Sequence, residues 1–133
     1  MSTRDAHELP AGLPAGYPYR ADDETTPREL HALLHTAAAN TLVLDVRTAP
    51  EWDICRIHGA KLLPLQELEL RIDELKADLD DDLARPIVVH CHHGRRSLTA
   101  TYLLRAAGFT NVKSLAGGIH LWSSDIDPSV PTY

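Results

Sequence analysis

Short apolar runs alternate with amphipathic segments along this chain. The runs TLVLDV (41–46) and PIVVH (86–90) are almost wholly apolar, which is typical of strands that a parallel sheet covers on both faces. AKLLP (60–64) and NVKSL (111–115) are weaker strand candidates. The pattern therefore predicts several short, buried strands rather than a sheet with one solvent-exposed face.

The segments between these runs have helical spacing. Apolar residues step by three and four from Leu65 to Leu79, which predicts one amphipathic helix. A second helix is predicted from about Arg96 to Ala107, with Gly108 at the position of a left-handed C-cap. Strands that alternate with helices indicate a single α/β domain built on a parallel sheet.

The first predicted helix begins in the stretch TTPRELHALL. Thr26 can cap it, Pro27 suits its first position, and Glu29 stands where a capping box places its acid. Its apolar stripe is expected to run from Leu30 to Ala37. Residues 1–24 are rich in Pro, Gly and charge, so we expect an extended N-terminal arm followed by the domain at 25–133.

Size and charge exclude several classes of protein. The 133 residues suffice for one domain, and a net charge of −6 argues against a nucleic-acid or membrane-surface binder. No stretch has the length of a transmembrane helix, and MSTRDAHELP lacks the apolar core of a signal peptide. Two cysteines make no disulfide framework, so we expect a cytoplasmic protein with reduced thiols. We also expect a monomer or a weak dimer.

Cys91 is the strongest candidate for chemistry. It ends the 86–90 strand, where α/β sheets bind ligands, and its loop leads into a predicted helix. Gly94 lets the loop curl so that free amides converge, and Arg95 and Arg96 add positive charge. Such surroundings favour a thiolate, which makes Cys91 a candidate nucleophile for an anionic substrate. The alternative is a buried core thiol, the usual fate of a cysteine after an apolar strand.

The sequence HCHH also invites a metal interpretation, which we do not favour. Zinc ligand pairs normally have two to four intervening residues, and adjacent side chains are expected to project in different directions. No second cluster with ligand spacing follows. We therefore expect no metal and no cofactor, with His92 and His93 at the mouth of the loop and His90 in the strand.

Two other groups of residues have a structural and a functional interpretation. Cys55 lacks the glycine and arginine context of Cys91, which favours a structural thiol over a resolving thiol. Asp45, Arg47 and Glu51 could supply a catalytic carboxylate pair. A salt-bridged network that braces this end of the sheet is the interpretation we favour.

Four motifs together resemble a known family. LVLDVRTAPEW, IHGAKLLP, CHHGRRS and LAGGIHLW occur in the order seen in the rhodanese homology domain, over roughly residues 25–133. The resemblance implies a three-layer α/β domain whose central sheet has five parallel strands between helices. It also implies that Cys91 carries a persulfide, cradled by a loop of His92, His93, Gly94, Arg95 and Arg96. The closing segment is similar to rhodanese domains joined to enzymes that activate sulfur-carrier proteins.

The expected activity is sulfur transfer. A small anionic donor such as thiosulfate would give its sulfane sulfur to Cys91, and a thiol, cyanide or a sulfur-carrier protein would accept it. One alternative is a non-catalytic or regulatory binding module, which the presence of Cys91 disfavours. The other is a cysteine-dependent phosphatase, whose loop between cysteine and arginine is longer than the four residues found here.

Overall fold

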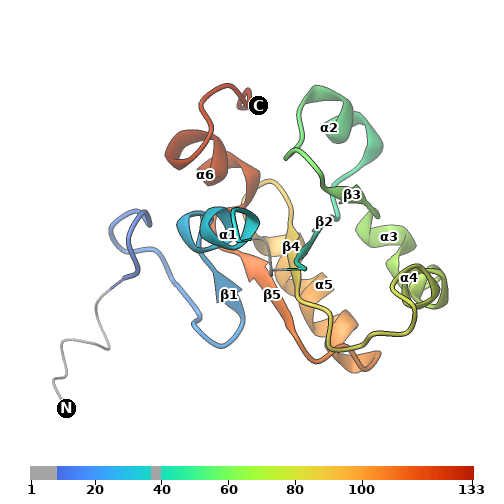
Figure 1. Ribbon diagram of the computed structural model, residues 1–133. Helices are drawn as coiled ribbons and strands as arrows, with labels where there is room; N and C mark the ends of the chain where they lie inside the picture. The colour runs from blue at the N-terminus through green and yellow to red at the C-terminus, as the bar shows by residue number, and fades with distance from the viewer. Residues whose placement is uncertain (1–8, 37–39) are drawn as a thin grey trace, which may run out of the picture.

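The computed structural model describes residues 9–36 and 40–133, which form one central sheet (Figure 1). All paired strands are parallel, and the sheet has five strands in the order β1-β5-β4-β2-β3. The strands are β1 (Glu24–Thr25), β2 (Leu42–Asp45), β3 (Lys61–Leu62), β4 (Ile87–His90) and β5 (Val112–Leu115). The predicted α/β class and the five-stranded parallel sheet are confirmed.

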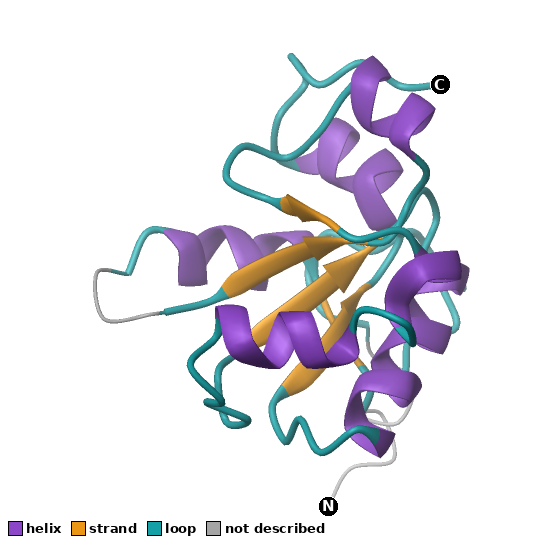
Figure 2. Cartoon of the chain, turned by 90° about the vertical axis from the view of Figure 1, so that its right-hand side faces the viewer, coloured by secondary structure: helices purple, strands orange, loops and turns teal. Residues whose placement is uncertain are grey.

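Helices cover both faces of this sheet (Figure 2). One core cluster joins Leu44, Ile87 and Val89 of the strands to side chains of α3, α4 and α5. The other joins Val43, Val88 and Leu115 to side chains of α1 and α6. The helices are α1 (Pro27–Leu34), α2 (Ala49–Ile54), α3 (Leu65–Leu68), α4 (Ile72–Asp78), α5 (Arg95–Ala106) and α6 (Gly118–Asp125).

Local sequence signals set several helix ends. The Glu29 amide donates to Thr26 Oγ1 over 3.1 Å, and the Thr26 amide donates to Glu29 Oε1 over 3.0 Å, which confirms the predicted capping box of α1. After α5, Gly108 has φ +108°, and the Phe109 amide bonds back to the Leu104 carbonyl, which confirms the predicted C-cap. Ala37, the last residue of the predicted α1 stripe, lies outside the described residues.

The single helix predicted from Leu65 to Leu79 is wrong in one respect, because it is two helices. The chain leaves helical geometry at Arg71, with φ −109° and ψ 13°, and α4 starts at the next residue. Arg71 bridges the break with side-chain bonds to Glu67 and Glu74. The apolar stripe survives the break because the turn between α3 and α4 keeps Leu68 and Leu75 buried on one side.

Residues 9–24 reach the sheet through polar contacts. Tyr19 Oη donates to the Glu24 carbonyl, and Lys113 Nζ donates to the carbonyls of Ala21 and Asp22. Glu24, the last residue of the predicted arm, is the first residue of β1. The part of the arm in residues 1–8 lies outside the described residues, and the domain boundary at 24/25 stays a prediction. No helix among the described residues is long and apolar enough to cross a membrane.

Candidate active site

Cys91 lies at the carboxyl end of β4, as predicted, and its sulfur is the centre of the loop. The side chain is 1% exposed, and Sγ accepts hydrogen bonds from the backbone amides of Gly94, over 3.1 Å, and Ser97, over 3.4 Å. Gly94 makes this curl possible with φ +113°, and α5 starts directly after it. Two converging backbone N–H groups at a helix start favour negative charge on the sulfur.

Two buried serines continue the hydrogen bonding around Cys91 Sγ. Ser97 Oγ accepts from the Cys91 thiol over 3.4 Å, donates to the Gly94 carbonyl and lies 2.7 Å from Ser114 Oγ on β5. Both serines are fully buried. The sequence interpretation did not use Ser97, although it closes the CHHGRRS motif, and nothing in the sequence marks Ser114. The two hydroxyls fix the position of the loop against the sheet.

The five predicted site residues that follow Cys91 lie in the loop after β4 and in the first turn of α5, and four of them line a common cavity. This cavity has a volume of about 420 Å³ and is lined by Cys91, His92, His93, Arg95 and Arg96. Gly94 is buried beneath it and supplies its amide to the sulfur. The loop thus offers a small site with a sulfur at its base and two guanidinium groups at its walls.

Arg96 is held by Glu51, which starts a network beside the cavity. Its Nη1 and Nη2 lie 2.6 and 2.9 Å from the two carboxylate oxygens of Glu51. Hydrogen bonding to Arg96 lowers the pKa of Glu51 far below its usual range, against the opposing effect of burial. Tyr133 Oη donates to Glu51 over 2.6 Å and accepts from Arg47 over 2.9 Å. Burial, followed by its bond to Glu51, raises the pKa of Tyr133 to about 12.

The fully buried pair of Asp45 and Arg47 completes the network. Arg47 Nη2 lies 2.8 Å from Asp45 Oδ2, and Arg47 also donates to the backbone carbonyls of Glu51 and Cys55. The predicted salt-bridged network is therefore confirmed. His90 faces the same carboxylate over 3.6 Å, and burial lowers its pKa to about 4, which keeps it neutral.

Tyr133 contributes a contact that the sequence did not indicate. Its ring stacks on that of His92, with centroids 4.0 Å apart and an angle of 8° between the planes. His92 Nε2 is buried and has no hydrogen-bond partner among the described residues. Burial, with smaller contributions from His93 and His120, lowers the pKa of His92. One wall of the cavity is thus a neutral imidazole under an aromatic ring.

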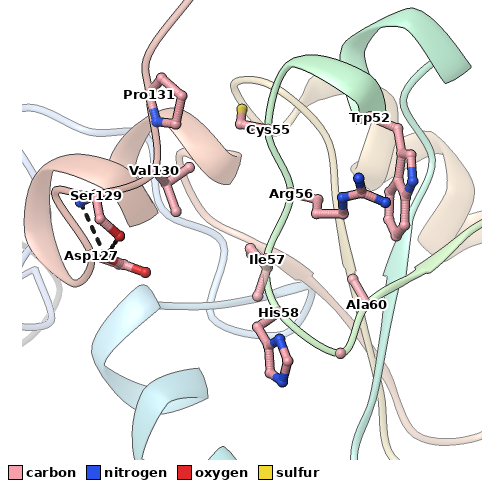
Figure 3. A pocket seen from close by; sticks show the side chains of 11 residues that line it. Trp52, Cys55, Arg56, Ile57, His58, Ala60, Asp127, Ser129, Val130 and Pro131 are labelled. Carbon is pink, nitrogen blue, oxygen red and sulfur yellow. Dashed lines mark hydrogen bonds between the residues drawn. The ribbon is translucent and has the colours of Figure 1, made fainter.

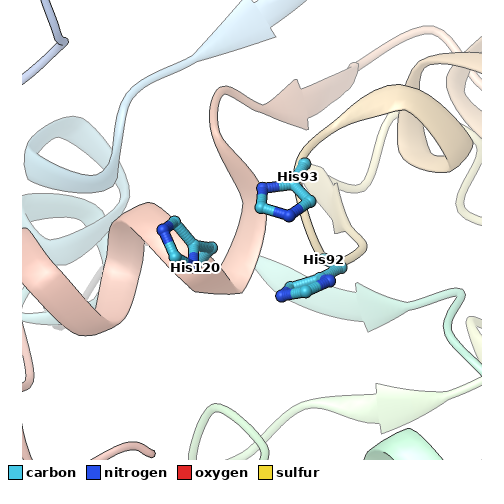
Figure 4. Close-up of side chains that lie close together, drawn as sticks. All are labelled: His92, His93 and His120. Atoms are coloured by element: carbon cyan, nitrogen blue, oxygen red, sulfur yellow. The ribbon is translucent and has the colours of Figure 1, made fainter. Parts of the chain in front are cut away.

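The histidines depart from one expectation. Adjacent side chains were expected to diverge, but the rings of His92 and His93 have centroids 4.0 Å apart (Figure 4). His120, from the first turn of α6, lies 4.9 Å from His93 by the same measure. The expectation failed because the loop between β4 and α5 is curled, so the alternation of an extended strand does not apply to it.

Cys55 does not line the Cys91 cavity. It is 8% exposed in the core cluster with Ile57, which supports the structural interpretation. A second cavity of about 450 Å³ lies beside it, between the segment after α2 and the segment after α6 (Figure 3). Arg56 stacks over Trp52 at the rim of this cavity, 4.7 Å from the ring centre. The cavity does not include Cys91 among its lining residues.

Comparisons with solved structures agree with this architecture. The human single-domain sulfurtransferase TSTD1 superposes with a TM-score of 0.66 at 29% identity, over 76% of this chain and 95% of that one. The rhodanese-like domain of the Anabaena protein Alr3790 gives a TM-score of 0.66 at 28% identity, over 76% of this chain and 73% of that one.

Curated sequences match at higher identity but are much longer proteins. Adenylyltransferase and sulfurtransferase MOCS3-2 of Zea mays is 39% identical over 93 residues, which are 69% of this chain and 19% of that protein. Probable adenylyltransferase/sulfurtransferase MoeZ of Mycobacterium tuberculosis is 37% identical over 108 residues, 81% of this chain and 26% of that protein. The rhodanese-like domain pattern itself matches residues 26–125, and the chain belongs to the family of rhodanese-like domains.

Proposed function

We propose that this domain is a sulfurtransferase that carries sulfane sulfur as a persulfide on Cys91. The observation that carries the proposal is the hydrogen bonding of Cys91 Sγ to the amides of Gly94 and Ser97 at the base of a cavity with two arginines. Relatives named as sulfurtransferases support the general activity. This chain spans only 19–26% of the curated relatives described above, so their other activities are not transferred to it.

In the first step, the Cys91 thiolate attacks the outer sulfur of thiosulfate. A bond forms between Sγ and that sulfur, the sulfur–sulfur bond of thiosulfate breaks, and its electron pair leaves with sulfite. The product is a persulfide whose terminal sulfur is negatively charged. The Gly94 and Ser97 amides, which bond to Sγ, stabilise the attacking thiolate. The exposed Arg95 supplies positive charge that attracts the dianionic donor, while Arg96 lines the same cavity in its ion pair with Glu51.

In the second step, an acceptor thiolate attacks the terminal sulfur of the persulfide. The electron pair of the broken bond returns to Sγ, which restores the Cys91 thiolate and yields a persulfide on the acceptor. Cyanide can replace the thiol in an assay. The proposed physiological acceptor is a small thiol or a sulfur-carrier protein.

The geometry favours this proposal over phosphate-ester hydrolysis. A phosphatase would use the arginine of the loop to clamp the substrate, whereas here both Nη atoms of Arg96 bond to Glu51. Within the described loop, two backbone amides bond to the sulfur. The loop is also shorter than that of a cysteine-dependent phosphatase, because only four residues separate Cys91 from Arg96.

Mass spectrometry of the thiosulfate-treated protein tests the proposal. We expect one added sulfur atom on the peptide that contains Cys91, and its loss on addition of cyanide with formation of thiocyanate. Cys91→Ser should abolish both signals, while Cys55→Ser serves as the matched control and should retain them. Full transfer activity in Cys91→Ser would refute the proposal, and an unmodified Cys91 in wild type would support a non-catalytic binding module.

A further inference from the structure

We propose that His92, His93 and His120 form a binding site for a divalent transition metal of the zinc class, beside the Cys91 cavity and without Cys91 as a ligand. One donor atom from each of the three histidines lies within 4.8 Å of the others. The sequence had predicted no metal, but that argument assumed diverging neighbours and did not consider His120. The inference is independent of the proposed sulfur transfer.

The backbone holds the three histidines together. The Ile119 amide donates to the Cys91 carbonyl over 2.9 Å, and the His120 amide donates to the His92 carbonyl over 3.1 Å. These two bonds fasten the first turn of α6 to the loop that carries His92 and His93. Gly118 permits the close approach, because a Cβ there would lie 2.4 Å from the His92 oxygen and 2.5 Å from the Cys91 oxygen. The cluster therefore follows from a fixed contact between two elements.

From these positions the three histidine side chains can rotate to coordinate a metal ion. Tetrahedral zinc with bonds of about 2.0–2.1 Å to nitrogen needs its ligand atoms roughly 3.4 Å apart. The present separation of up to 4.8 Å exceeds this by about 1.4 Å. His93 and His120 are exposed, so their rings are free to rotate while the backbone stays in place. Figure 4 shows the three rings gathered on the same side of the loop and α6.

A second observation points to a ligand at this place. His92 Nε2 is buried and has no hydrogen-bond partner among the described residues. Buried polar atoms are normally satisfied, and an exception in a cluster of ligand-type side chains indicates a missing partner such as a metal ion. Tyr133 stacks on the same ring and limits its rotation, which pre-orients this ligand.

The chemistry of the donor set indicates the class of metal. Three imidazoles without a carboxylate or thiolate suit Zn²⁺, Ni²⁺ and Cu²⁺ rather than Mg²⁺ or Ca²⁺. Three protein ligands leave a fourth position of tetrahedral zinc open. Because His92 and His93 also line the Cys91 cavity, an ion held by the three histidines would lie at the wall of that cavity.

Zinc titration of the untagged protein, in competition with a chromogenic chelator, tests the proposal. We expect one zinc ion per chain, and at least about tenfold weaker binding in His93→Ala and in His120→Ala, since even the loss of a residue that only supports a ligand costs 10–100-fold. Both side chains are exposed, and unchanged melting temperatures would confirm that the variants fold. His58→Ala removes an exposed histidine elsewhere and should bind zinc like wild type.

Two further measurements distinguish this site from other possible zinc sites in the protein. The rings of His31 and His35 also lie close together, with centroids 4.2 Å apart, and could bind zinc instead. If His31→Ala weakened zinc binding and His120→Ala left zinc affinity unchanged, the proposal would be overturned. With Co²⁺, Cys91→Ser should keep the wild-type visible spectrum. A sulfur-to-cobalt charge-transfer band that disappears in Cys91→Ser would refute the ligand set, as would the absence of stoichiometric zinc binding in wild type. Because Cys91→Ser cannot form the persulfide, its zinc binding is judged separately from sulfur transfer.

Discussion

Arg96 and Glu51 form a two-point ion pair that joins the first turn of α5 to α2. The two nitrogen–oxygen distances are 2.6 and 2.9 Å, and the Glu51 side chain is 18% exposed. Arg96 therefore lines the cavity as one member of a neutral pair. Arg95, which is exposed at the same cavity, supplies the excess positive charge. Arg95 can therefore attract an anionic donor with its net charge, whereas Glu51 already balances the charge of Arg96.

Arg96→Ala should impair the proposed sulfur transfer more than Arg95→Ala. The Arg96 variant leaves the Glu51 carboxylate without its cation beside the cavity, and that carboxylate then repels thiosulfate. We expect KM for thiosulfate to rise about tenfold, on the scale of one hydrogen bond between charged groups. Steady-state kinetics with thiosulfate and cyanide measure this change.

The double variant Arg96→Ala/Glu51→Gln provides the control. It removes the repelling carboxylate together with the arginine, so KM should recover in part relative to Arg96→Ala alone. If the double variant is no better than the single one, Arg96 binds the donor directly and the ion pair does not explain its role.

Ser97→Ala should lower both stability and the rate of persulfide formation. The change leaves the buried Ser114 hydroxyl without its partner at 2.7 Å, which costs about 1–3 kcal/mol. It also removes the hydroxyl that contacts Cys91 Sγ. Urea unfolding and the rate of sulfur loading on Cys91 measure the two effects.

Ser97→Ala/Ser114→Ala separates these effects. Removing both hydroxyls leaves no unpaired buried group, so stability should return toward wild type while loading of Cys91 stays slow. If the loading rate recovers together with stability, Ser97 acts only through the packing of the loop.

Local signals in the sequence were enough to predict which strand, loop and helix carry the site. The apolar run that ends at His90, and Gly94 followed by a helix, placed Cys91 at the end of a strand and in a turn. The capping box at Thr26 was recognised, whereas the same pattern at Thr48 and Glu51, which starts α2, was overlooked.

The contacts missing from the sequence interpretation are long-range. Tyr133 and Glu51 are 82 positions apart, and Ser97 and Ser114 meet only because α5 packs on β5. His120 joins His92 through backbone bonds between α6 and the loop, which no residue pattern reveals. Such pairs are determined by tertiary packing, so periodicity and spacing along one chain do not identify them.

Gly94→Ala should destabilise the protein and slow the loading of Cys91. Gly94 has φ +113°, and a left-handed backbone costs a residue with a side chain about 1–2 kcal/mol. The nearest atoms to a new Cβ would be 3.5 Å away, so the cost comes from backbone strain rather than from a clash. Relief of that strain would move the Gly94 amide away from Sγ. Thermal unfolding and sulfur loading measure the two consequences.

Gly16→Ala is the matched control for this variant. Gly16 has φ +78°, a Cβ added there would meet nothing within 4 Å, and the residue lies outside the loop. We expect a comparable loss of stability with an unchanged loading rate. Equal loss of loading in both variants would show that global stability, and not the Gly94 amide, limits the reaction.

The ion pair of Glu51 also predicts a dependence of stability on pH. Arg96 lowers the pKa of Glu51 in the folded state below the ordinary value of 4.5, so the folded protein binds a proton at Glu51 less readily than the unfolded chain. The contribution of the Glu51 charge to the free energy of unfolding is present above pH 4.5. This contribution is lost as the pH falls from 4.5 through the lower pKa of Glu51 in the folded state. The difference in free energy of unfolding between wild type and Glu51→Gln should therefore be constant from neutral pH down to about pH 5.5 and shrink in more acid solution. Urea unfolding of both proteins across this range measures it. A difference that stays constant down to pH 3 would show that Glu51 stabilises the fold by packing and neutral hydrogen bonds, without a contribution from its charge.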